Sequence, residues 1–109
     1  MSFHKAMPLS DLWCGEMAAC SIAGRKILLV RTEQGVCAFE DRCAHLGVPL
    51  SQGSLAAGVI TCSAHHYQYD VYSGLGINPR TVCLKSFNVN VEDGVVYVDI
   101  APEQPNEPN

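Results

Sequence analysis

The chain lacks any long hydrophobic stretch and carries little basic charge, and these two features exclude some classes of function. No apolar run approaches the roughly 18 residues that a membrane-spanning helix needs. The first residues, Met1–Lys5, include no apolar segment of the kind found in a signal peptide. Seven Lys and Arg residues against eleven Asp and Glu residues give a net charge of −4, whereas nucleic-acid binding favours the opposite sign. We therefore expect a cytoplasmic protein that binds neither membranes nor nucleic acid.

The composition that remains is typical of one globular domain. The chain has 109 residues, of which 48% are hydrophobic and 17% are charged. Short β-branched segments alternate with turns, and the Asp93-Gly94 pair suits a tight hairpin because that turn requires positive φ angles. We predict a single all-β domain over residues 1–100, with strands at 26–31, 36–39, 87–91 and 95–100.

Three other segments are predicted to differ from this β pattern. Leu9–Trp13 suits a short helical turn with Ser10 as its N-cap. Residues 41–80 are rich in glycine and proline and would struggle to build a core of their own, so another component must organise them. Residues 101–109 hold three prolines and little apolar surface, which predicts a disordered tail.

The six cysteines fall into two groups. Cys14, Cys20, Cys37 and Cys83 lie among apolar neighbours, and we expect them to be buried as small hydrophobic side chains. The other two are each followed closely by a histidine, in the patterns Cys43-x-His45 and Cys62-x-x-His65.

Two thiolates and two imidazoles suit two kinds of metal centre. They can bind one tetrahedral zinc, or a [2Fe–2S] cluster in which two histidines replace two cysteines on one iron. The Cys-x-His spacing is tighter than that of ordinary zinc-finger halves, and it lets one loop reach both irons of a cluster. It therefore favours one [2Fe–2S] cluster bound by Cys43, His45, Cys62 and His65, with a zinc-stabilised, non-redox binding module as the alternative. The neighbouring His66 fits the Cys-x-x-His spacing less well than His65.

The two halves, separated by sixteen residues, resemble the Rieske iron–sulfur signature. The turn residues around them agree with that signature: Leu50-Ser51-x-Gly53, Gly58–Cys62 and Tyr69-Asp70-x-x-Ser73-Gly74, followed by Pro79. The resemblance implies a Rieske-type β-sandwich that carries a small, loop-rich cluster-binding subdomain at about 41–80, with the cluster near one tip. It also implies that the two cysteines bind one iron and the two histidines the other.

The resemblance further implies the subtype. Respiratory Rieske proteins have a disulfide at the positions of Val48 and Ala64, where none can form here. The stretches 11–17 and 74–79 are similar to the ferredoxin component of four-component toluene and o-xylene monooxygenases. Such a ferredoxin is an electron-transfer component and not an enzyme. The chain also has neither a glycine-rich nucleotide loop nor a nucleophile–base pair.

The implied partners are an NADH-dependent flavin/iron–sulfur reductase and a di-iron hydroxylase of aromatic hydrocarbons, and we expect the carrier to be a monomer. The alternative recipient is a ring-hydroxylating dioxygenase. A cluster-free subunit resembling that of nitrite reductase is disfavoured because all four ligands are present. The docking tip is expected to include Leu46, Val48, Leu75 and Ile77. Tyr69 occupies a position from which high-potential Rieske proteins donate a hydrogen bond to the sulfur of the first-loop cysteine, here Cys43.

Overall fold

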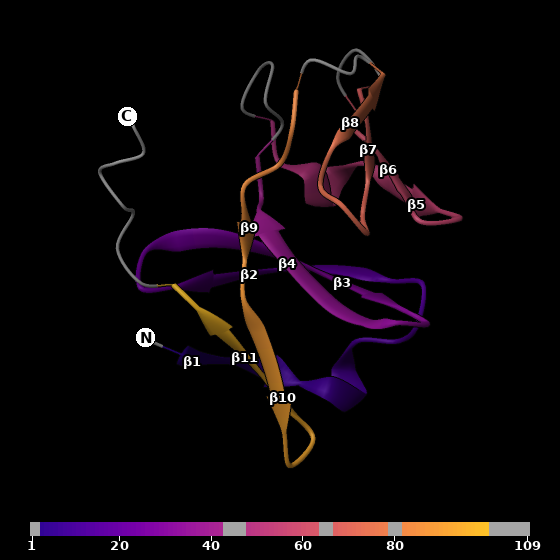
Figure 1. Ribbon diagram of the computed structural model, residues 1–109. Helices are drawn as coiled ribbons and strands as arrows, with labels where there is room; N and C mark the ends of the chain where they lie inside the picture. The colour runs from indigo at the N-terminus through magenta and orange to yellow at the C-terminus, as the bar shows by residue number, and fades with distance from the viewer. Residues whose placement is uncertain (1–2, 43–47, 64–66, 79–81, 101–109) are drawn as a thin grey trace.

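Three antiparallel sheets make up the protein in the computed structural model, which describes residues 3–42, 48–63, 67–78 and 82–100 (Figure 1). The first sheet has the order β1 (Phe3–Pro8), β11 (Val95–Asp99), β10 (Val89–Glu92). The second has the order β2 (Met17–Ile22), β3 (Arg25–Thr32), β4 (Gly35–Glu40), β9 (Ser86–Phe87). The third has the order β5 (Ser54–Ala56), β6 (Val59–Thr61), β7 (Gln68–Asp70), β8 (Gly76–Asn78).

Two short 3-10 helices are the other regular elements among the residues described: η1 (Leu9–Asp11) and η2 (Leu50–Gln52). The all-β prediction is therefore confirmed. None of the described segments forms a helix with the length and apolar character needed to cross a membrane.

Strand β3 is the central layer, because residues 27–30 are completely buried. Ile27 and Leu29 belong to one hydrophobic cluster together with Val96 and Val98 of the first sheet. Side chains alternate between the two faces of a strand, and Leu28 and Val30 accordingly join a second cluster, which includes Ile60 of the third sheet. One strand thus packs against both neighbouring sheets.

Most of the predicted strands are observed, with adjusted bounds. The segments predicted at 26–31 and 36–39 are β3 and β4. The segment predicted at 87–91 is divided at Asn88 into β9 and β10, and β11 follows the predicted hairpin turn. The sequence did not predict β1, β2 or the four short strands between residues 54 and 78.

Two local predictions are wrong. The helical turn begins after Pro8, whose side chain makes no capping hydrogen bond, so Ser10 is not the N-cap. Cys14 and Cys83 are exposed rather than buried, while Cys20 and Cys37 are half-buried.

Burial raises the pKa of the Cys37 thiol. Burial, with a smaller contribution from the nearby charge of Asp41, raises the pKa of the Cys20 thiol. Both thiols therefore stay protonated over a wider pH range than an exposed cysteine.

The hairpin turns carry local strain at alanine. In the two-residue turn between Ile22 and Arg25, Ala23 has φ 51° and Gly24 has φ 81°. Asp93 occupies the equivalent position of the β10–β11 turn with φ 53°. Asn, Asp and Gly tolerate this left-handed region, whereas alanine lacks the side chain that compensates for it locally.

Replacing Ala23 by asparagine should therefore stabilise the protein. We expect Ala23→Asn to raise the free energy of unfolding by about 0.5–1 kcal/mol, a part of what L-residues lose in this region. Urea denaturation would measure the change. The matched substitution Asp93→Asn should have little effect, because aspartate already tolerates the conformation; equal effects of the two changes would contradict the explanation.

Candidate metal centre

Of the four predicted ligands, Cys62 lies in the described part of the chain, whereas Cys43, His45 and His65 lie outside it. Cys62 directly follows β6 and is completely buried, in the same cluster as Ile60 and Tyr69. Its backbone N–H donates a hydrogen bond of 2.7 Å to the carbonyl oxygen of Tyr67. That bond joins the two ends of the segment that contains His65.

The segment that contains Cys43 and His45 follows β4 and is also closed at its base. The Asp41 carboxylate, only 5% exposed, accepts two hydrogen bonds from Ser51. Oδ1 accepts the Ser51 backbone N–H and Oδ2 accepts the Ser51 hydroxyl, each at 2.8 Å. The Asp41 N–H donates to the Lys26 carbonyl oxygen at 3.0 Å and so continues the β3–β4 ladder. Both ends of residues 42–50 are therefore fixed to the second sheet.

Gly53 brings the two segments together. A Cβ at this position would overlap the Thr61 carbonyl oxygen and would lie 3.3 Å from the Cys62 Cα. The backbone that follows η2 therefore approaches the end of β6 more closely than any side chain permits. Beside this approach lies a depression of about 290 Å³ bounded by residues 52–54 and 61–63.

These observations show that the chain fits a [2Fe–2S] cluster. The sequence supplies two thiol and two imidazole donors, which is the donor set of the mixed-ligand cluster. The described backbone closes each donor segment at its base and places the end of the first against Cys62. The described residues contain no other group of three or more His, Cys, Asp or Glu side chains able to hold a metal.

Tyr69 is completely buried on β7, where it pairs with Ile60 and Gly76. Complete burial removes bulk water as a partner for its hydroxyl. The predicted bond to Cys43 involves a residue outside the described part of the chain, so it stays a prediction.

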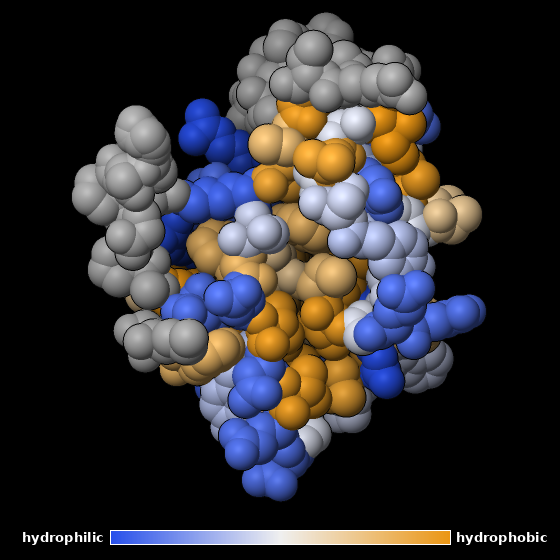
Figure 2. Space-filling model, viewed as in Figure 1, coloured by the Kyte–Doolittle hydropathy of each residue, from blue (hydrophilic) through white to orange (hydrophobic). Residues whose placement is uncertain are grey.

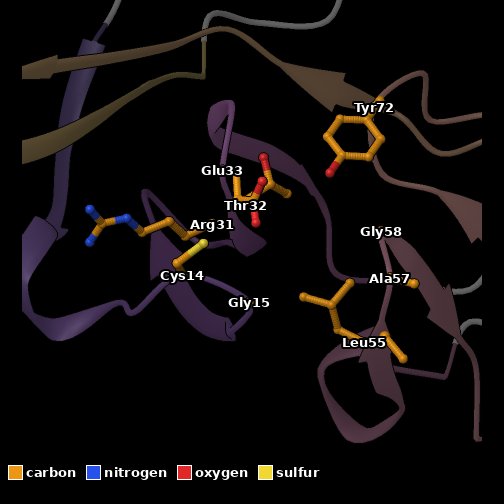
Figure 3. Close-up of a pocket in the computed structure, with 10 residues that line it drawn as sticks. Cys14, Gly15, Arg31, Thr32, Glu33, Leu55, Ala57, Gly58 and Tyr72 are labelled. Atoms are coloured by element: carbon orange, nitrogen blue, oxygen red, sulfur yellow. The ribbon is translucent and has the colours of Figure 1, made fainter.

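A second cavity, of about 360 Å³, lies between the second and third sheets (Figure 3). Its wall includes Cys14, Glu33 and Tyr72. The Arg31 guanidinium points away from it and donates to the Leu12 carbonyl oxygen at 2.8 Å. In Figure 3 the Cys14 sulfur and the Tyr72 hydroxyl lie well apart on different elements. The cavity thus presents no nucleophile paired with a base.

The close approach at Gly53 is testable by adding one methyl group. We expect Gly53→Ala to lower the free energy of unfolding by about 2–3 kcal/mol, because the added Cβ collides with backbone that cannot move aside alone. Iron bound per chain should fall with it, as measured by a colorimetric iron assay. The control Ser54→Ala, at the exposed neighbouring position, should change neither quantity; a fully loaded, stable Gly53→Ala protein would contradict the packing argument.

Comparisons with known proteins support the assignment of a [2Fe–2S] site. The model of the Rieske [2Fe-2S] domain family matches residues 2–88. The ferredoxin component of the alkene monooxygenase system of Xanthobacter autotrophicus is 41% identical over 95 residues, which cover 86% of this chain and 78% of that protein. The ferredoxin component of the naphthalene 1,2-dioxygenase system of Pseudomonas putida is 28% identical over 98 residues, which cover 89% and 94% of the two chains.

The fold has a close counterpart among solved structures. A chain from the complex of reduced oxygenase and oxidized ferredoxin in carbazole 1,9a-dioxygenase superposes with a TM-score of 0.84 and 31% identity, covering 94% of this chain and 96% of that one. The family match accounts for both the donor set and the sheet arrangement. The chain belongs to the Rieske [2Fe-2S] domain family and is a ferredoxin, an electron carrier with one [2Fe–2S] cluster.

Proposed function

We propose that Cys43 and Cys62 bind one iron of the cluster and that His45 and His65 bind the other. When bound, the cluster supplies reversible one-electron transfer, and the protein holds, shields and presents it. The observation that carries the proposal is the closure of both donor segments at their bases, by the Cys62–Tyr67 backbone bond and by the Asp41–Ser51 pair. Loops fixed in this way hold ligands in a defined orientation.

The proposed recipient is a di-iron hydroxylase of a hydrocarbon monooxygenase system, supplied with electrons by an NADH-dependent flavin/iron–sulfur reductase. The 41% identity to an alkene monooxygenase ferredoxin supports this recipient over a dioxygenase, because ferredoxin components of naphthalene and biphenyl dioxygenases are 26–31% identical. The motif at residues 74–79 supports an aromatic substrate for the recipient. A ring-hydroxylating dioxygenase remains the second candidate, because the solved carbazole 1,9a-dioxygenase complex has this fold.

The proposed docking surface is apolar and lies at β8, which Leu75 directly precedes; Leu46, also predicted at this tip, lies outside the described residues. Leu75 is 59% exposed and Ile77 is 43% exposed. Ile77 lies between two residues of β8 that pair with the start of β7, directly after the segment that contains His65. Figure 2 shows apolar residues below the grey atoms at the upper right, where Figure 1 places β7 and β8, and a second apolar area lower on the same face. A small apolar contact suits a carrier that must release each partner quickly. A monomer with one such surface is sufficient for binding one partner at a time.

Two measurements test the function. Electron paramagnetic resonance of the dithionite-reduced protein should show the spectrum of a mixed-ligand [2Fe–2S] centre; a colourless protein that contains zinc would refute it, because zinc is d¹⁰ and has no redox chemistry. Reduced protein should then transfer electrons faster to a monooxygenase hydroxylase than to a dioxygenase. The reverse order of rates would assign the second recipient.

The ligand assignment distinguishes two adjacent histidines. His65→Ala should abolish the normal cluster, because one iron loses an imidazole that its geometry requires. His66→Ala, the matched control one position along the chain, should leave the visible and paramagnetic resonance spectra intact. An intact cluster in His65→Ala and a lost one in His66→Ala would reverse the assignment.

The docking surface is tested by one added charge. Leu75→Asp should slow electron delivery to the hydroxylase about tenfold or more, because the apolar contact would have to bury a carboxylate. The cluster spectrum should not change. The control Val91→Asp alters a valine that is 41% exposed on β10 and should leave delivery unchanged; equal effects of the two changes would place docking elsewhere.

A further inference from the structure

Asp41 is the one buried polar or charged residue among those that the structure describes. Its two carboxylate oxygens accept hydrogen bonds from the backbone N–H and the hydroxyl of Ser51, and both donors are electrically neutral. Burying a carboxylate is costly unless a cation or several donors compensate it. Fold stability alone therefore gives a poor account of why a charge occupies this position.

Asp41 connects the end of β4 to η2. The residue directly follows β4, and its N–H continues the β3–β4 ladder to Lys26. On the far side it is bonded to Ser51 within η2. Its negative charge acts on the thiol of Cys20 on β2 and raises the pKa of that group. The field of this carboxylate thus extends to neighbouring side chains.

Asp41 is also close to the proposed cluster. One residue, Arg42, separates it from Cys43 along the chain, so the two Cα atoms are at most about 7 Å apart. Reduction adds one negative charge to a cluster. A fixed carboxylate nearby opposes that addition, and it does so more strongly in a buried, low-dielectric setting than in water.

We propose that Asp41 is a positioning residue of the cluster site with two separable effects: its hydrogen bonds to Ser51 join the two ends of the segment that contains Cys43 and His45, and its charge lowers the reduction potential. This inference rests on the proposed ligand set, in which Cys43 and His45 belong to that segment. The Ser51 hydroxyl and N–H disperse part of the carboxylate charge. Asp41 and Ser51 should therefore change the reduction potential in opposite directions.

The opposite signs make the test selective. Asp41→Asn removes the charge and keeps an oxygen that accepts the Ser51 N–H, while its amide group donates to the Ser51 hydroxyl. Its potential should become more positive. Ser51→Ala removes one donor and leaves the charge less dispersed, so its potential should become more negative. Ser51→Thr keeps both donors and should match the unchanged protein. General damage to the site would not move the first two variants in opposite directions.

The experiment uses cluster-loaded full-length protein and two measurements. Protein-film voltammetry gives the potential, and the rate of iron release to a chelator reports the effect of the Asp41–Ser51 hydrogen bonds on cluster retention. Asp41→Ala should release iron several-fold faster than the unchanged protein, and Asp41→Asn should release it at nearly the original rate. A loaded Asp41→Asn protein with an unchanged or lower potential would overturn the effect of charge. Equal release from Asp41→Ala and the unchanged protein would overturn the effect of the Asp41–Ser51 hydrogen bonds.

Two further outcomes are also decisive. If Asp41→Asn does not assemble a cluster, the two Ser51 variants decide. A more negative reduction potential in Ser51→Ala but not in Ser51→Thr supports the inference, and equal potentials in the two variants overturn it. Paramagnetic resonance of the unchanged protein separates this inference from the function it rests on. A missing cluster signal there refutes the function and the inference together, whereas a normal signal with unaltered variants refutes the inference alone.

Discussion

The burial of β3 on both faces is the constraint on which the rest of the structure depends. Ile27 and Leu29 pack toward the first sheet, and Leu28 and Val30 pack toward the third. The strands of the third sheet have only three residues each, too few for independent stability. Their apolar face is stable because β3 and β4 supply the opposing surface. The third sheet, which contains the strand that precedes Cys62, therefore packs against one face of the second sheet.

The sequence predicts the parts of this arrangement that depend on local pattern. The apolar run within 26–31 indicates a buried strand, and the Asp93-Gly94 pair indicates the hairpin between β10 and β11. The two Cys–His pairs indicate the ligands for the same reason, since their spacing is a local feature. The bounds of the cluster-binding subdomain at 41–80, and the tail at 101–109, stay predictions, and that tail lies outside the described residues.

Features that depend on contacts between distant parts of the chain could not be predicted from local sequence pattern. Three-residue strands are shorter than the window in which periodicity is detectable, so the third sheet was interpreted as loops. The requirement for Gly53 comes from Thr61, and that for Asp41 comes from Ser51; neither partner is identifiable before the chain is folded. Cys14 was expected to be buried because of its apolar neighbours, but it lies in a turn closed by the Glu16 N–H and the Trp13 carbonyl oxygen and is exposed.

The distribution of charge connects the site to its use as a carrier. Two acidic and two basic residues balance within 41–80, so the net charge of −4 belongs to the rest of the chain. The β10–β11 turn with Glu92 and Asp93 lies at the opposite end of the molecule from β8 (Figure 1). Charge at a distance steers approach, and its effect falls with ionic strength. The proposed apolar contact at β8 would need no desolvated ion pair to form or break. In this proposal, remote charge orients the partner and uncharged side chains make the contact, so that one electron is delivered in a complex that dissociates readily.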